Sequence, residues 1–467
     1  MRLSKRLIGI FYAILACVVC VVLVVLSGQN AWTQTKGIPI PELKSEIPHN
    51  PPPLTKKEEA FGAFAWQTFV ALNWPADCKT GSSKDIKIGQ AHEEPRVWEF
   101  YNFPESVFHS NLEKSVPLEN PSQCHPNQSI AVPVRYTEPA DDPDFQFRRL
   151  ALIDQSGNYI LNEIHLNPTE VNQIVAQGWN SPNNLVNFND QDNKFALVCS
   201  DNNEGKEGFP CETKDDVGAI EIKAAWRVLP DLKEQEVKDD QYYSLCGSSK
   251  VANEYKDKYY ITCRTFEVED LQKQKKELTV PVGLVGFHIM QKTSDQGWIF
   301  STFEHIDNVR DESNQNSTKY TLFDPNCQGD YCKPNYPFAK KPYLWSDQSP
   351  YGFTEGEKAQ IHSQIIREVP ITKVAKELNE KWKQELKGSI WQYYQLIGTQ
   401  WLEEFDVPNT HNIEPTTGTD FSKLANVTLE PYIQKTKLGM SCMKCHINAQ
   451  LPNNASADFS FLLNEHD

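Results

Sequence analysis

The sequence predicts an α+β fold in which an antiparallel, β-rich body is followed by a helical C-terminal part. Between about residues 96 and 353, short runs rich in β-branched and aromatic residues alternate with turns rich in Asn, Asp, Gly and Pro, which is typical of antiparallel strands. From Glu355 to Glu404 the apolar residues instead recur at helical spacing. The chain of 467 residues is long enough for roughly two to four domains.

The N-terminal segment has the pattern of a secretory signal or a membrane anchor. Basic residues in the first six positions precede an uncharged apolar run from Leu7 to Leu26. The run exceeds the ~7–15 residues of a usual signal and approaches the ~20 that span a bilayer. We therefore expect residues 1–28 to be a signal peptide, cleaved after Ser27 or Gly28, or an anchor. In either case the rest of the chain is exported, to the periplasm or an equivalent compartment.

A Pro-rich linker and a helix come next. Residues 29–55 contain six prolines, which favours an extended linker. Apolar residues then recur at helical spacing from Lys56 to Asn73, and the pattern ends at Trp74-Pro75. We expect residues 56–353 to contain this helix and the β-rich body.

Five runs of the body are predicted strands: 147–153, 219–229, 259–268, 278–292 and 298–306. Residues 155–158, Gln-Ser-Gly-Asn, have turn chemistry. They predict a hairpin whose second strand begins at Tyr159.

Residues 354–467 are the predicted helical C-terminal part. Three stretches show helical periodicity, around residues 361–366, 374–382 and 390–397. A short helical piece is predicted from Ser422 to Leu429, and the chain then enters a cysteine motif.

The motif Cys442-Met443-Lys444-Cys445-His446 has the form C-x-x-C-H, on which haem is attached covalently in c-type cytochromes. Each thiol forms a thioether with a haem vinyl group, and the adjacent histidine ligates the iron. A zinc site would need further ligands at short spacing, and a redox dithiol would need a βαβ context. The sequence therefore predicts one covalent haem c, bound through Cys442 and Cys445 with His446 as the proximal iron ligand.

No methionine follows His446, so we expect either that the second axial ligand comes from upstream or that the iron is five-coordinate and open. Two histidines lie on the predicted strands 278–292 and 298–306, namely His288 and His305. Gly286 leaves space beside His288, where a flat ring could approach closely. We expect His305 or His288 to be the distal ligand or a distal-pocket residue; the structural alternative for each is a hydrogen-bonded residue of the sheet. Met290 on the same strand is expected in the core.

Eight cysteines remain outside the apolar run and the haem motif. An even number in an exported chain predicts disulfides. The pairing that closes the shortest loops is Cys78–Cys124, Cys199–Cys211, Cys246–Cys263 and Cys327–Cys332.

The formal net charge is −16, which argues against nucleic acid as a partner because a phosphate backbone requires a basic face. The charge favours a basic redox partner protein through long-range steering, and it also serves solubility.

Several stretches resemble a group of large exported bacterial proteins, the cytochrome c family proteins with a single C-terminal C-x-x-C-H motif. The stretches are residues 221–226, 283–288, 298–308, 441–446 and 457–463. The resemblance extends from about Phe61 to Leu463. It implies a covalent haem and export and leaves the activity open.

Three functions are compatible with these patterns. The first is electron transfer by an exported mono-haem c-type cytochrome, whose single haem and lack of a recognisable catalytic set fit a carrier. The alternative is a haem-dependent oxidoreductase, a peroxidase or oxygenase with an open distal site, which the large β-rich body would suit. A haem-based sensor or assembly subunit is a third reading. No catalytic residues are assigned.

Overall fold

The computed structural model describes most of the chain from residue 42 onward. The described ranges are 42–54, 56–90, 94–108, 130–131, 151–188, 195–199, 217–230, 242–246, 249–269, 272–294, 296–310, 319–337, 343–345, 352–354, 362–402, 423–434 and 441–463. Residues Glu42–Asp467 belong to one compact unit. The predicted signal or anchor, residues 1–28, lies outside these ranges. Among the described helices, none has the length and apolar character needed to cross a bilayer.

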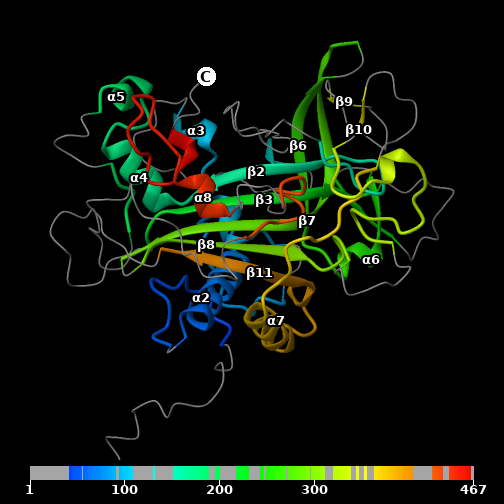
Figure 1. Ribbon diagram of the computed structural model, residues 1–467, viewed down its shortest axis with the longest axis horizontal. Helices are drawn as coiled ribbons and strands as arrows, with labels where there is room; N and C mark the ends of the chain where they lie inside the picture. The colour runs from blue at the N-terminus through cyan, green and yellow to red at the C-terminus, as the bar shows by residue number, and fades with distance from the viewer. Residues whose placement is uncertain are drawn as a thin grey trace, which may run out of the picture. The chain divides into compact units, whose positions relative to one another are not determined.

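A mixed, mainly antiparallel sheet forms the centre of the unit (Figure 1). The long strand β7 pairs along one edge with β3, while its other edge pairs first with β6 and then with β8. Strand β2 adds to β3, β11 adds to β8, and the short β1 pairs in parallel with β6. The strands are β1 (Ile130–Ala131), β2 (Ile160–Leu166), β3 (Ile220–Val228), β6 (Ile261–Glu269), β7 (Lys275–Thr293), β8 (Gly297–His305) and β11 (Tyr394–Trp401).

Smaller elements complete the described structure. Two short hairpins are β4–β5 (Tyr242–Leu245, Ser249–Ala252) and β9–β10 (Tyr343–Trp345, Gly352–Thr354). The α-helices are α2 (Lys57–Leu72), α3 (Pro104–Phe108), α4 (Pro168–Ala176), α5 (Pro182–Val186), α6 (Asn253–Lys256), α7 (Lys373–Glu385) and α8 (Cys442–His446). The α+β class with an antiparallel β-rich body is therefore confirmed.

Most predicted elements of the body are present. The helix predicted at residues 56–73 is α2, and the strands predicted at 219–229, 259–268, 278–292 and 298–306 are β3, β6, β7 and β8. The predicted hairpin is also present, since Ile153 bridges Tyr159 and β2 begins at Ile160. Residues 147–150 of the first predicted strand lie outside the described residues.

The predicted helicity of the C-terminal part is confirmed only in α7, while the haem motif forms the one-turn helix α8. Residues 362–372 are not helical, and residues 423–430 form extended chain and turns. The helix predicted around residues 390–397 is wrong in its second half: Ile390–Tyr393 forms a single 3-10 turn, but Tyr394–Trp401 is strand β11, paired with β8. Seven of its eight residues are buried. A strand buried on both faces shows apolar residues at consecutive positions, which the spacing does not distinguish from a helix.

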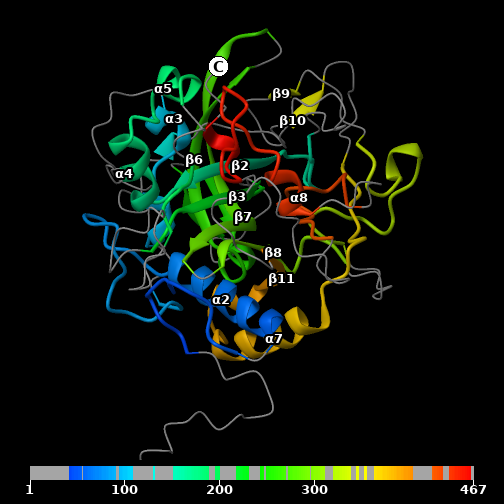
Figure 2. The same ribbon diagram turned by 60° about the vertical axis from the view of Figure 1, so that its left-hand side comes forward.

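Helix α2 covers one face of the β7–β8 hairpin with aromatic side chains. Phe69 stacks on Phe303 of β8 with ring centroids 4.2 Å apart, and Trp66 contacts the same ring edge-on at 5.0 Å. Trp66 also stacks on Trp382 of α7 at 5.4 Å. Figures 1 and 2 show α2 below β8 and β11, with α8 above these strands. The hairpin is therefore buried from both sides.

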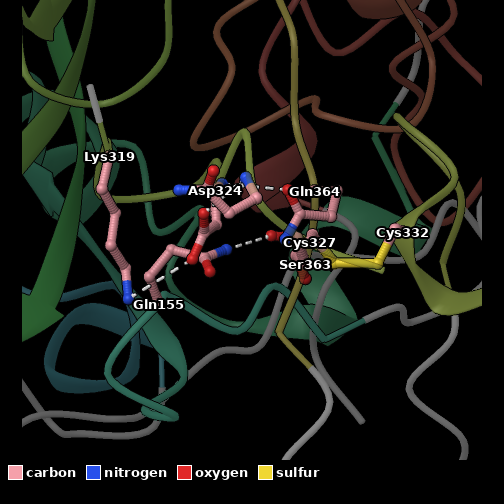
Figure 3. Close-up of a disulfide and its surroundings, with 8 residues drawn as sticks. Gln155, Lys319, Asp324, Cys327, Cys332, Ser363 and Gln364 are labelled. Carbon is pink, nitrogen blue, oxygen red and sulfur yellow. Dashed lines mark hydrogen bonds and ion pairs between the residues drawn. A yellow bond between two sulfur atoms is a disulfide. The ribbon is translucent and has the colours of Figure 1, made fainter. Parts of the chain in front are cut away.

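Two of the predicted disulfides are confirmed, Cys246–Cys263 and Cys327–Cys332. The other two predicted pairs involve Cys124 and Cys211, which lie outside the described residues. Figure 3 shows the Cys327–Cys332 disulfide beside the extended segment around Ser363 and Gln364. The backbone N–H of Asp324 donates to Oε1 of Gln364 at 3.0 Å, which links the disulfide loop to that segment.

Candidate haem-attachment site

Helix α8 is a single turn made of the C-x-x-C-H residues. Ser441 caps it, because its hydroxyl accepts the backbone N–H of Lys444 at 3.2 Å. Cys442, Cys445 and His446 occupy positions i, i+3 and i+4, which are neighbours on one side of a helix. Met443 is fully buried, and its backbone N–H donates to Oε1 of Gln400 on β11. The three groups required for haem attachment thus share one side of an anchored turn.

The His446 ring is held by a backbone carbonyl. Its Nδ1 lies 2.7 Å from the carbonyl oxygen of Phe459. Because a carbonyl only accepts, Nδ1 carries the proton and Nε2 is the nitrogen that would ligate iron. Metal-ligating histidines commonly use such a bond to fix the tautomer and ring orientation. The rings of Phe300 and Phe461 each lie 5.0 Å from the imidazole.

The two thiols have the electrostatics of protonated, unreactive cysteines. Both are half-buried, and they are the cysteines outside disulfides within the described ranges. Burial, followed by the negative charge of Glu430, raises the pKa of Cys445 to about 11. The same two causes and the neighbouring thiol raise the pKa of Cys442 well above its usual value. A reactive dithiol requires a lowered pKa, so these surroundings disfavour a thioredoxin-like role.

A zinc site also finds no support among the residues that the structure describes. No cluster of three or more His, Cys, Asp or Glu side chains with metal-binding geometry occurs there. A structural zinc ion requires four such ligands.

Apolar side chains of β7 and β8 pack against α8. Met290 on β7 pairs with Phe300 on β8, and both belong to a buried cluster with Met443 and Phe459. Met290 is therefore a core residue, as predicted. This surface would exclude water from one side of a flat, apolar group bound to α8.

His288 lies on the same face of β7 as Met290, two residues away. It is mostly buried, and its Nε2 lies 2.8 Å from Oε1 of Glu430. Burial alone would raise the pKa of Glu430, but the charge and hydrogen bond of His288 bring this pKa below its usual value. The negative charge of Glu430 also raises the pKa of both motif cysteines. The His288–Glu430 pair therefore lies close enough to α8 to interact with it electrostatically.

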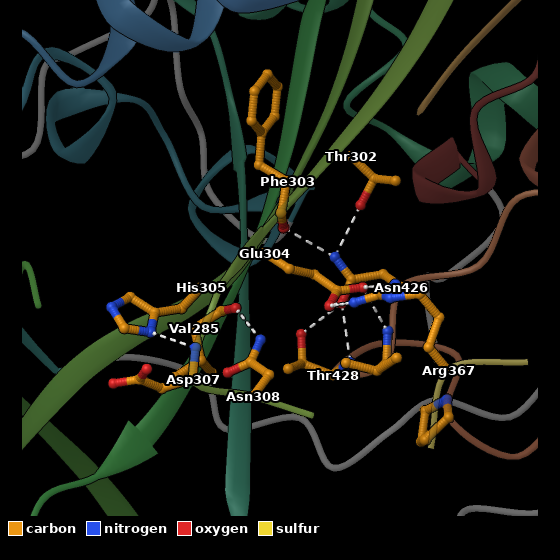
Figure 4. Close-up of polar contacts among 12 residues, drawn as sticks. Val285, Thr302, Phe303, Glu304, His305, Asp307, Asn308, Arg367, Asn426 and Thr428 are labelled. Atoms are coloured by element: carbon orange, nitrogen blue, oxygen red, sulfur yellow. Dashed lines mark hydrogen bonds and ion pairs between the residues drawn. The ribbon is translucent and has the colours of Figure 1, made fainter. Parts of the chain in front are cut away.

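The loop that carries Glu430, residues 426–430, is held against the sheet by hydrogen bonds between buried polar groups (Figure 4). Asn426 Nδ2 donates to Thr302 Oγ1 at 2.8 Å and to the Phe303 carbonyl at 2.9 Å. Glu304 is paired with Arg367 and accepts the backbone N–H of Val427 at 2.8 Å. The position of Glu430 is therefore set by β8.

The space expected beside Gly286 is filled by this loop. A Cβ atom at Gly286 would collide with Oγ1 of Thr428 and come within 3.3 Å of Oδ1 of Asn426. The glycine thus permits a close approach of backbone and side chains rather than of a flat ring. The prediction of a ring at this position is corrected accordingly.

His305 does not lie with His446. It is fully buried on the opposite face of β8 from Glu304, as Figure 4 shows. Its Nε2 lies 3.1 Å from the Lys258 carbonyl, and its Nδ1 accepts the backbone N–H of Asp307 at 3.2 Å. The ring stacks on Tyr259 at 3.9 Å. Both nitrogens are engaged away from α8, which matches the structural alternative for this residue.

Three residues of the site are not identified by motif spacing or periodicity in the sequence. The charge of Glu430 acts on the pKa of both motif cysteines, and the Phe459 carbonyl accepts the hydrogen bond from His446. Asp458, next to Phe459, contacts Lys292 of β7. Only the haem motif itself is recognisable from spacing.

Comparisons of the chain with protein-family models, with curated proteins and with solved structures find no match. The haem hypothesis therefore depends on the C-x-x-C-H motif and on the geometry around it.

Gly286→Ala should destabilise the fold by about 1–3 kcal/mol, because the added methyl group overpacks a filled site. Thr428→Ala should remove the collision, so the two substitutions should be less than additive in a double-mutant cycle. Urea unfolding of the four proteins measures this coupling. Strict additivity would show that the loop does not lie over Gly286.

His305 should make stability depend on pH. Burial lowers the pKa of His305 from 6.5 to about 4. The folded state therefore favours the neutral ring, and its stabilising effect is complete above pH 6.5 and is lost as the pH falls toward 4. Over this range the free energy of unfolding should fall about 3 kcal/mol further in the wild type than in His305→Gln. Parallel curves from urea titrations of the two proteins would contradict the burial of a neutral His305.

Proposed function

We propose that the protein is an exported c-type cytochrome that carries one covalent haem and transfers electrons. The observation that carries the proposal is the hydrogen bond from His446 Nδ1 to the Phe459 carbonyl, at 2.7 Å. It gives the histidine of a C-x-x-C-H turn the tautomer and fixed orientation that an iron ligand needs. The resemblance of residues 441–446 and 457–463 to large exported cytochrome c family proteins supports the same class.

Each residue of α8 has a defined role in this proposal. Cys442 and Cys445 would hold the haem as thioethers, and His446 would bind the iron on the proximal side. The haem, when bound, supplies a one-electron iron couple. The rings of Phe300 and Phe461, each 5.0 Å from the imidazole, would shield it on the proximal side. Glu430 places a negative charge near the attachment points, which favours the oxidised, more positive state.

His288 is the histidine that we propose for the distal side, as second ligand or distal-pocket residue. It shares a sheet face with Met290, and its partner Glu430 acts on both motif thiols. His305 has neither property.

The His288–Glu430 hydrogen bond also favours a second function. If the pair persists in the holoprotein, the two side chains form an acid–base group beside an open iron site. A haem-dependent peroxidase or oxygenase would use such a pair. This oxidoreductase is the alternative to the electron carrier.

Export and partners complete the proposal. The apolar run at residues 7–26 would direct the chain out of the cytoplasm and could keep it attached to the membrane. The net charge of −16 would steer a basic redox partner toward the protein.

The first test is covalent attachment of haem. The chain, expressed with its N-terminal segment in a bacterium that matures c-type cytochromes, should gain the mass of one haem. Denaturing gels should retain haem peroxidase staining in the wild type and in the control Cys327→Ser/Cys332→Ser. Cys442→Ser/Cys445→Ser should lose the stain. An unmodified wild-type mass would overturn the proposed function.

The second test separates carrier from enzyme. If His288 ligates the iron, the wild type should be low-spin and indifferent to carbon monoxide, and His288→Ala should become high-spin and bind it. His305→Ala is the matched control and should keep the wild-type spectrum. A high-spin wild type that binds carbon monoxide would reject the simple carrier in favour of the oxidoreductase. A low-spin spectrum unchanged in His288→Ala would exclude His288 as the ligand.

A further inference from the structure

The turn that presents the Phe459 carbonyl to His446 has an unfavourable backbone conformation. Asp458 has φ 51° and Phe459 has φ 70°, so two consecutive non-glycine residues adopt the left-handed region. This region is uncommon for residues with a Cβ atom, and for a bulky residue such as Phe it is a marked exception. Such a conformation persists only where the surrounding structure enforces it.

The Asp458 side chain holds the turn in this conformation. Its carboxylate is 1% exposed, and Oδ2 accepts the backbone N–H of Leu197 at 2.7 Å and contacts Nζ of Lys292. Lys292 is also 1% exposed and belongs to the central strand β7. A buried ion pair of this kind requires close geometry, because neither charge can be left without its partner. The turn is therefore tied to the C-terminal end of the central strand β7.

A continuous path of contacts leads from the sheet to the proximal histidine. Lys292 fixes Asp458, the peptide between Asp458 and Phe459 is held in the left-handed conformation, and the Phe459 carbonyl accepts the hydrogen bond donated by His446 Nδ1–H. Phe459 is itself buried and contacts Phe300 of β8 at 6.3 Å. The orientation of the imidazole thus depends on an ion pair that does not touch it.

We propose that Lys292 and Asp458 are positioning residues for the haem iron: they hold the strained Asp458–Phe459 turn so that the Phe459 carbonyl orients His446. This inference deepens the proposed function and depends on it for the identity of the metal group. The positioning of His446 itself is a property of the chain and can be tested without haem.

The other charged groups near the pair come from α4 and β3. Glu170 of α4 and Glu221 of β3 are both buried, and the two carboxyl groups interact electrostatically. Burial, followed by Glu221 and then Asp458, raises the pKa of Glu170 well above its usual value. Lys292 is the cation paired with Asp458 in this region.

Two substitutions distinguish a positioning role of the ion pair from a simple effect of its charges on the reduction potential. A weaker bond to Nδ1–H makes the imidazole a poorer electron donor and destabilises oxidised iron, so the reduction potential rises. If the pair acts through position, Asp458→Asn and Lys292→Met should both raise the potential. If it acts only through charge, removing the cation should lower the potential and removing the anion should raise it.

The experiment is a redox titration of the holoprotein with these two variants. We expect each to shift the one-electron reduction equilibrium about tenfold toward the reduced state, which corresponds to ~59 mV. Asp154→Asn is the control, since it breaks another buried pair, Asp154 with Arg227 at 3.1 Å, and should leave the potential unchanged. Asparagine is tolerated in the left-handed region, so Asp458→Asn should fold. Shifts of opposite sign, or none, would overturn the proposal.

A second readout needs no haem. In the full chain expressed without haem maturation and labelled with ¹⁵N-histidine, the His446 signal, assigned by its loss in His446→Gln, should show the Nδ1–H tautomer. Asp458→Asn should shift it toward the Nε2–H tautomer, and Asp154→Asn should not. An unchanged tautomer in Asp458→Asn would overturn the positioning role. If the chain never acquires haem but the tautomer shifts, the proposed function fails while the positioning of His446 stands.

Discussion

The burial of the β7–β8 hairpin on both faces is the constraint on which the rest of the site depends. One face is covered by the aromatic side chains of α2, and the other by α8 and the loop at residues 426–430. Because strand side chains alternate between faces, the polar residues in the paired part of the hairpin, residues 286–293 and 297–305, are largely removed from water on one side or the other. Each must then find a partner in the segment that covers it.

Those partners come from distant parts of the chain, and they determine where the C-terminal segments lie. Lys292 contacts Asp458, Glu304 contacts Arg367, and His288 contacts Glu430. A buried pair adds little net stability compared with apolar packing, but removal of one partner costs about 3–5 kcal/mol. The pairs therefore act mainly by excluding other arrangements of the C-terminal segments. In this way the sheet places the C-x-x-C-H turn, although the turn is separated from the hairpin by more than a hundred residues of sequence.

This dependence on distant partners explains which parts of the molecule can be predicted from sequence. The strands at residues 219–229 and 298–306 are recognisable because β-branched and aromatic runs end at turn residues, which is a local property. The strand at residues 394–401 was predicted as a helix because burial on both faces removes the alternation that marks a strand. Alternation shows that His288 and Met290 share a face, but it does not show which face meets α8. Glu430 and Asp458 carry no local signal, since only the tertiary fold brings them to the motif.

The distribution of buried charge also bears on the choice between carrier and enzyme. Away from α8, Arg264 is fully buried and donates to Glu163 at 2.9 Å and to Glu99 at 2.8 Å. Such a group, matched on both sides by carboxylates, maintains packing and presents no charge to a substrate. Around α8, the contacts of His446 are fixed by the strained turn and its ion pair, whereas His288 and Glu430 are partly exposed. Rigid geometry at His446 suits both proposed functions, because it would fix the iron ligand in either case. The difference between them therefore lies in the His288–Glu430 pair: a carrier requires the histidine at the iron, and an oxidoreductase requires it beside a substrate.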